Sequence, residues 1–172
     1  SQKLITTISA SVTSNVAINL YEQNDSSKIT TISKRNLDKL YSYALTFDAP
    51  IKFLNWWNLN INLIAFYNYY VSTSSGGNLH NGSPDIKLYM LHTFSLPKAF
   101  KAEVNTKYET PSFYGISNYK SIYSVDLGVG RSLFNKQATI RLAASDLFNT
   151  QQLQYTSTYQ NLDLQAKDKV ES

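Results

Sequence analysis

The feature that most constrains this chain is a two-residue alternation of apolar and polar side chains that recurs along its length. The stretch 100–109, FKAEVNTKYE, shows it most clearly, because its even positions are apolar or aromatic except for Thr106 and its odd positions are charged or carry an amide. Side chains of a β-strand point to opposite faces of the sheet in turn, so a period of two is the period of a strand. The pattern predicts strands with one apolar and one polar face.

Seven further stretches show the same pattern in a stronger or weaker form. They are 41–49, 58–71, 86–96, 123–133 and 137–148, with vaguer ones near 4–21 and 158–170. No convincing helix is found, since the nearest candidate, RNLDKL at 35–40, is too short to bury a face. The sequence therefore predicts an all-β, antiparallel, up-and-down meander of about eight strands.

The connections between the predicted strands alternate between short and long. The short ones are 50–56, 97–99 and 135–137, and the long, polar and aromatic ones are 72–84, 110–120 and the stretch 149–161. In an up-and-down sheet every second connection lies at the same end, so one end carries tight turns and the other carries long loops. Outer-membrane barrels have this asymmetry, with short turns on the periplasmic side.

Aromatic residues gather near the predicted strand ends. Phe53, Trp56 and Trp57 lie at one turn, whereas Tyr69 and Tyr108 lie toward the long loops. Rings at both ends of an apolar band form the girdles that lie at headgroup depth in a membrane barrel. Charged residues make up only 16% of the chain, and neutral polar residues take their place, as expected of a water-filled lumen and equally of a soluble surface.

Several function classes find no support in the residues. The basic residues are scattered despite a net charge of +4, which argues against nucleic-acid binding. There is no cysteine, and the two histidines, His80 in a predicted loop and His92 on the apolar side of a strand, form no metal-binding or catalytic motif. We therefore expect no enzyme, no cofactor and no metal site.

Alternation alone does not tell the inside of a barrel from the outside. A transmembrane barrel has an apolar exterior and a polar lumen. A soluble, eight-stranded, lipocalin-like barrel that binds one small ligand has the reverse. A membrane-embedded enzyme or anchor with an eight-stranded barrel is a further alternative, and the missing catalytic cluster argues against the enzyme.

Four stretches together resemble the C-terminal part of TonB-dependent-receptor-like outer-membrane β-barrel proteins. They are NLYEQNDSSKITTISKRNLDK, LTFDAPIKFLNWWNLNINL, FSLPKAFKAEVNTKYETPSFYGI and SVDLGVGRSLFNKQATIRLAASDLFNT. The most specific element is a strand ending in LGVGRSLFNK, a short turn, and a strand ending in ASDLFNT. The resemblance covers essentially the whole chain.

The resemblance implies that residues 1–172 are a single segment of a 22-stranded type of barrel, a fragment without the plug and the final strand. It implies an outer-membrane transporter or receptor that takes up a large or scarce solute, in contact with outer-membrane lipid. Its expected partners are the TonB complex, reached through a plug, and a surface lipoprotein. The solute itself is not specified.

This orientation assigns the two faces of each strand. Ile140 and Leu142 are expected to face lipid, and Thr139 is expected on the lumenal side. The residues predicted to face the lumen are Asn60, Asn62, Lys101, Glu103, Lys107, Asp126 and Arg141. The residues predicted to bind ligand, because they are polar or aromatic and lie in long loops, are Asn78, Tyr114, Tyr119 and Tyr155.

Overall fold

The chain folds almost entirely into β-strands. The computed structural model describes residues 3–24, 26–27, 29–73, 79–114, 117–159 and 162–169. The strands are β1 (Ile5–Gln23), β2 (Thr30–Leu54), β3 (Trp57–Ser72), β4 (Leu79–Leu96), β5 (Phe100–Glu109), β6 (Ser112–Tyr114), β7 (Ser117–Tyr119), β8 (Ile122–Leu133), β9 (Ala138–Ala144), β10 (Gln152–Tyr159) and β11 (Leu162–Lys169). One 3-10 turn, η1 (Phe134–Lys136), is the helical element of the described residues, and no helix there is long and apolar enough to span a membrane.

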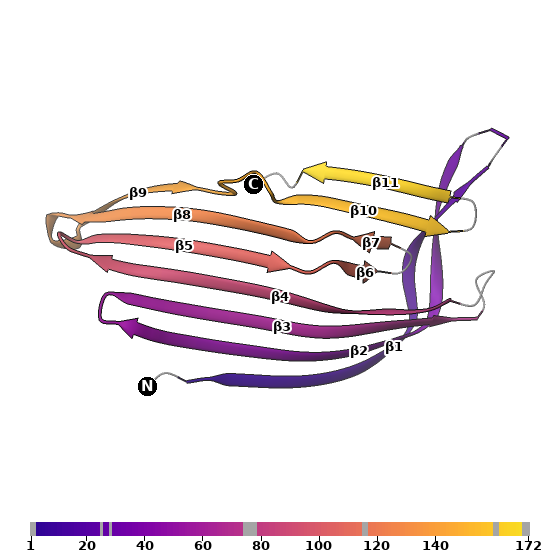
Figure 1. Ribbon diagram of the computed structural model, residues 1–172, viewed down its shortest axis with the longest axis horizontal. Helices are drawn as coiled ribbons and strands as arrows, with labels where there is room; N and C mark the ends of the chain where they lie inside the picture. The colour runs from indigo at the N-terminus through magenta and orange to yellow at the C-terminus, as the bar shows by residue number, and fades with distance from the viewer. Residues whose placement is uncertain are drawn as a thin grey trace.

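The strands form an antiparallel meander. Seven of them make one sheet in the order β1-β2-β3-β4-β5-β8-β9, and a second sheet has the order β11-β10-β7-β6. Figure 1 shows that β6 continues the line of β5, β7 that of β8, and β10 that of β9. Counting each of these pairs as one interrupted strand gives a meander of eight, so the predicted fold class is confirmed.

The interruption between β5 and β6 falls at Thr110 and Pro111. Proline has no backbone N–H and cannot donate to the ladder. The Thr110 hydroxyl accepts the backbone N–H of Ile86 at 2.8 Å and donates to Asp85 Oδ1 at 2.9 Å. The Thr110 side chain thus adds two hydrogen bonds where the strand breaks, beside the backbone bond from Thr110 N–H to the Ile86 carbonyl at 3.0 Å.

The interruption between β9 and β10 is built on Asp146, in the left-handed region with φ of 45°. Its carboxylate accepts the backbone N–H groups of Thr150 at 2.9 Å and Gln151 at 3.1 Å. Its own backbone N–H donates to Asp126 Oδ1 at 2.9 Å. The strand predicted over 137–148 therefore ends at Ala144, because this turn satisfies the backbone in place of a ladder.

The long connections contain more strand than the sequence predicted. β4 begins inside the expected loop 72–84, β6 and β7 form a hairpin inside 110–120, and β10 lies inside 149–161. The expected loop position of His80 is likewise wrong, since His80 lies in β4. The apolar row in these segments is short or broken by polar residues, so the alternation signal marks them only weakly.

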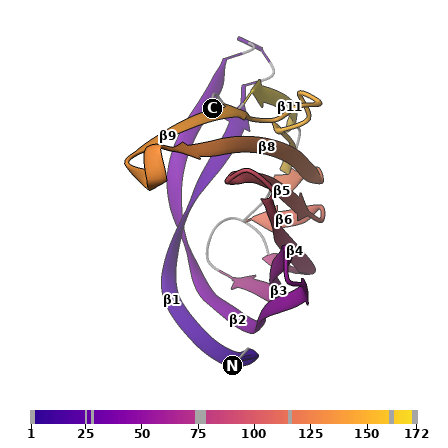
Figure 2. The same ribbon diagram turned by 90° about the vertical axis from the view of Figure 1, so that its left-hand side faces the viewer.

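The β1–β2 hairpin bends away from the sheet at Asn15, which has φ of 55° and lies opposite Asp38 at a gap in the β1–β2 register. Beyond the bend, Ile18 and Leu37 bury against Tyr70 of β3. Figure 2 shows the hairpin crossing toward the end of the molecule that carries β11, and β1 contacts both β10 and β11. The small core of the molecule therefore lies at the hairpin end and not beneath the long sheet.

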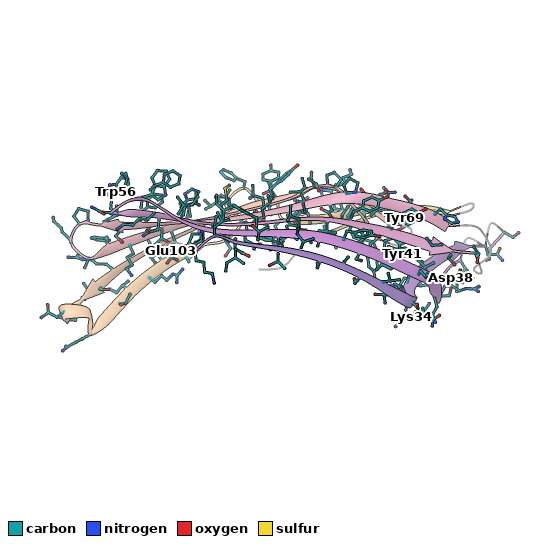
Figure 3. The ribbon with its side chains drawn as sticks, turned by 90° about the horizontal axis from the view of Figure 1, so that it is seen from below. Lys34, Asp38, Tyr41, Trp56, Tyr69 and Glu103 are labelled. Carbon is teal, nitrogen blue, oxygen red and sulfur yellow. The ribbon has the colours of Figure 1, made fainter. Side chains whose placement is uncertain are left out.

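The two faces of the long sheet differ in curvature and composition. Figure 3 shows Glu103 on the concave side and Trp56 on the opposite side. The outer strands β1 and β9 pair with β2 and β8 respectively and not with each other, so the described sheet is an open arc.

Candidate solute-facing surface

The convex face carries an aromatic cluster at the end with short turns. The Phe53 and Trp57 rings stack with centroids 4.6 Å apart, and Phe94 lies 5.9 Å from Trp57. Trp57 Nε1 donates to Nδ1 of His92 at 3.2 Å. His92 is thus a ring-stacked, hydrogen-bonded partner on the apolar face.

A second aromatic group lies on the same face toward the hairpin end. The Tyr41 and Tyr69 centroids are 6.5 Å apart, and Tyr67 and Tyr69 stack at 6.4 Å. From Trp57 to Tyr67 the strand advances about 33 Å, at roughly 3.3 Å per residue. With a strand tilt of about 40°, this gives a band about 25 Å tall, the height of the lipid-facing band of a membrane barrel.

Several apolar side chains of the convex face are exposed, whereas Leu59 and Ala49 on the same face are 6% and 4% exposed. Ile140 is 61% exposed and Leu142 is 76% exposed. No protein segment covers them in the described part of the chain, and large apolar side chains left open on this scale mark a surface that meets an apolar partner.

The concave face carries hydrogen-bonded polar pairs across neighbouring strands. Asn62 Nδ2 donates to Asp48 Oδ1 at 2.5 Å, and Asn105 Nδ2 donates to Asp126 Oδ2 at 3.1 Å. Arg141 reaches Glu103 at 2.6 Å. The strand register places all seven residues predicted to face a lumen on this one face, which are Asn60, Asn62, Lys101, Glu103, Lys107, Asp126 and Arg141.

A charged cluster lies on the same face, near the break between β5 and β6. The Glu109 carboxylate pairs with Lys87 at 2.9 Å and Lys107 at 2.8 Å, and it accepts the Tyr89 hydroxyl at 3.3 Å. Of these residues the sequence analysis listed only Lys107 as a lumen-facing candidate, although Glu109 belongs to the same polar row of 100–109. The same period of two could have found the others, because Lys87 and Tyr89 alternate with the apolar row of 86–96.

Two glycines open a hollow in the concave face. Gly128 and Gly130 stand between β5 and β9, and a hollow of about 130 Å³ is lined by Lys101, Glu103 and Arg141 together with these glycines. A Cβ on Gly128 would lie 3.4 Å from Arg141 Nη2. The missing side chain of Gly128 lets Arg141 cross over β8 to reach Glu103. A second hollow, lined in part by Asn60, Asn62 and Tyr89, lies farther along the sheet.

The predicted ligand residues lie in hairpins at the far end of the sheet. Tyr119 of β7 and Tyr155 of β10 are direct cross-strand partners, with ring centroids 5.2 Å apart. Tyr114 of β6 is 51% exposed and makes an edge contact with Tyr70 at 6.0 Å. Asn78 lies outside the described residues. The structure thus brings two of the four residues into contact, and their role in binding stays a prediction.

Below this pair the hairpins are held by buried hydroxyls. Ser117 and Ser157 are 6% and 0% exposed, and their Oγ atoms are 2.5 Å apart. Among the described residues, no group of three or more His, Cys, Asp or Glu side chains is placed to hold a metal ion.

Comparison with known proteins gives a family but no individual relative. No curated protein and no solved structure matches the chain. The model of the outer membrane protein beta-barrel family matches residues 1–172. This family places the protein in the cell outer membrane. Barrels of that membrane have an apolar outer band and a polar interior. The chain therefore belongs to the outer membrane protein beta-barrel family.

Proposed function

We propose that this chain forms part of the barrel wall of an outer-membrane transporter or receptor of the TonB-dependent type, which takes up a large or scarce solute. The observation that carries the proposal is the wide, polar, concave face, with its charged pairs and hollows, on a sheet that does not close on itself.

The open arc favours a wide barrel. The lumen of a barrel widens as strands are added, and eight strands leave room for side chains or one small ligand. In an eight-stranded closed barrel the first and last strands pair, whereas β1 is an edge of the long sheet and β11 is an edge of the second sheet, with no ladder between them. No observation favours the soluble, lipocalin-like alternative, and the resemblance to TonB-dependent receptors points to the 22-stranded, plugged type.

The polar network suits a wall that contacts a moving solute or a plug. Its side chains are already paired with one another, so the face stays wet without an unpaired buried charge. Arg141 and Glu103 remain 63% and 37% exposed in their side chains and are open to a polar partner in the lumen. We propose that a plug occupies this lumen and contacts the TonB complex, and that the protein has no enzymatic role.

The hairpin end suits capture of a solute from outside the cell. Short turns mark the periplasmic end, so the hairpins that carry Tyr114, Tyr119 and Tyr155 extend into the external medium. Aromatic rings with polar tips contact large solutes over a wide area at low conformational cost. A surface lipoprotein that delivers the solute would bind at this same end.

Growth of a deletion strain under nutrient limitation tests the proposal. A strain without this protein is grown with iron chelates, cobalamin or oligosaccharides as the single limiting nutrient, beside a strain without the TonB complex. We expect both strains to fail on the same nutrient, because uptake needs both components. Growth of the deletion strain equal to the parent strain on every nutrient contradicts energised uptake. So does a nutrient on which the deletion strain fails while the strain without the TonB complex grows normally.

A variant with Tyr119→Ala and Tyr155→Ala tests the hairpin site separately. We expect a lower apparent affinity for the limiting solute with an unchanged amount of protein in the membrane. The matched control is Tyr67→Ala on the lipid-facing side, which should leave solute affinity unchanged.

A further inference from the structure

One charged side chain stands on the lipid-facing surface. The register gives the lipid-facing positions of β2 from Tyr41 onward, β3, β4, β5, β8 and β9. Among these described positions, Arg131 is the one residue with a charged side chain (Lys, Arg, Asp or Glu). A charge on this surface requires a local reason, since a lipid-facing Arg is costly near the membrane midplane.

The position of Arg131 in depth removes most of that cost. Arg131 is the cross-strand partner of Phe100 on one side and of Ile140 on the other, and β8 ends two residues later at Leu133. It therefore lies at the short-turn end, level with the aromatic rings that mark the headgroup layer. The cost of a lipid-facing charge falls to about 0–1 kcal/mol near this interface.

The Arg131 guanidinium is held against a ring and not against an acid. Its central carbon lies 4.9 Å from the centroid of Phe100. The five carboxylates between residues 39 and 144 all belong to the opposite, lumenal face, and they are Asp48, Asp85, Glu103, Glu109 and Asp126. No ion pair of Arg131 occurs within the described part of the chain, so an anionic partner has to come from the lipid side.

We propose that Arg131 binds the phosphate of an anionic phospholipid in the periplasmic leaflet of the outer membrane. A guanidinium binds phosphate oxygens through two parallel N–H bonds, and Phe100 holds the guanidinium plane in place by a cation–π contact. The neighbouring Ile140, exposed to lipid, provides a surface for the first acyl methylenes. The site depends on membership of the family and on membrane insertion, and not on transport.

Lipid enrichment around Ile140 tests the site in the full-length protein. A single cysteine at Ile140 carries a fluorophore, and the protein is reconstituted in vesicles of phosphatidylcholine that contain either nitroxide-labelled phosphatidylglycerol or nitroxide-labelled phosphatidylcholine at equal mole fraction. We expect the anionic quencher to be preferred roughly fivefold, which corresponds to the worth of one basic residue at an anionic membrane surface. The preference should weaken as salt is raised.

Three substitutions distinguish binding by the Arg131 guanidinium from a general effect of positive charge. Arg131→Gln should abolish the preference, while Arg141→Gln, which removes the same charge from the lumenal face, should leave it intact. Arg131→Lys keeps the charge without the planar fork and should keep part of the preference.

Three results overturn the proposal. One is equal quenching by the two lipids in the unmodified protein. Another is a preference that survives Arg131→Gln. The third is no quenching by either lipid, because Ile140 and its partner Arg131 would then not face lipid at all.

Discussion

The two faces of the long sheet are made by the same strands, yet they obey opposite rules. On the lumenal face, polar side chains find partners in neighbouring strands, as Asn62 does with Asp48 and Arg141 does with Glu103. On the opposite, apolar face, Ile140 and Leu142 are largely exposed. A soluble domain buries its apolar face, whereas this sheet leaves it bare, because lipid replaces the core.

The difference shows that the surroundings of a side chain depend on the face of the strand to which it points. Because successive side chains alternate between the two faces, the surroundings change from one residue to the next. Two neighbours in one strand, such as Ile61 and Asn62, lie about 3.3 Å apart along it and point to opposite faces. In a membrane barrel we expect one to meet hydrocarbon and the other water. A single substitution should thus have a large effect on one face and a small effect on the other.

The largest expected effect comes from a charge placed at mid-depth on the lipid-facing side. Ile61→Arg should lower the free energy of unfolding of the full-length protein in vesicles by about 2–4 kcal/mol, since arginine meets hydrocarbon there. Urea titration in vesicles measures it. The matched change Asn62→Arg places the same charge beside Asp48 on the lumenal face and should change the free energy by less than about 1 kcal/mol. Equal losses for the two variants would remove the distinction between the faces.

A glycine on the lipid-facing side gives the next largest effect. A Cβ at Gly82 would lie 2.7 Å from the Asn68 carbonyl oxygen and 2.9 Å from the hydroxyl of Tyr67 and from Cδ2 of Tyr69. Gly82→Ala should therefore destabilise the protein by about 1–3 kcal/mol, because the backbone contact cannot be relieved by a rotamer change. The same urea titration compares it with Gly130→Ala. A Cβ at Gly130 would lie 3.5 Å from the Ile140 carbonyl oxygen, so this variant should leave the free energy of unfolding nearly unchanged.

A smaller and local effect on stability is expected at the buried hydroxyl pair of Ser117 and Ser157, which joins β7 and β10. Ser157→Ala removes the hydroxyl that lies 2.5 Å from Ser117 Oγ and should cost about 1 kcal/mol in the hairpins. Amide hydrogen exchange should rise in β7 and β10 and stay unchanged in β3. The double variant, with Ser117→Ala added, should recover part of the protection because no buried hydroxyl is then unpaired. Faster exchange throughout the sheet would contradict a local role.

The smallest effect is expected from the exposed ion pair of the lumen. Glu103→Gln should change the free energy of unfolding by less than about 1 kcal/mol, because both partners are open to water. A double-mutant cycle with Arg141→Gln should give a coupling of roughly 0.2–1 kcal/mol that falls as salt is added. A coupling of several kcal/mol would mean that the pair is shielded from water in the assembled protein.

The sequence predicted the strands that have two unlike faces. Alternation in 100–109 and 123–133 places β5 and β8, and the row Ile86, Leu88, Met90 is found on one side of β4. It also placed the seven lumenal candidates on one face, since parity is all that this assignment needs. Whether a solute touches them is a separate prediction.

The sequence missed structure where the apolar row ends. β7 (SNY) is too short to show a period, and β10 (QLQYTSTY) has a weak apolar row with one aliphatic residue and a break at Ser157, so hydrophobic alternation does not identify them clearly. Their pairing follows from contacts between hairpins far apart in the chain, such as Tyr119 with Tyr155. Residues 35–40, which are too short a stretch to form a helix with a buried face, lie in β2, where the hairpin beyond Asn15 packs Leu37 against Tyr70. The charges of Lys87 and Glu109 became a cluster only through the β4–β5 register.

The open arc also limits how this wall reaches its place in the membrane. The outward backbone groups of β1, and those of β9 on the side away from β8, have no ladder partner in the long sheet. An unpaired backbone amide or carbonyl in hydrocarbon costs several kcal/mol, so even the seven-residue edge of β9 opposes the insertion of such an arc by itself. Insertion and ring closure are thus expected to be one concerted event, in which each strand enters hydrocarbon only as its neighbour arrives.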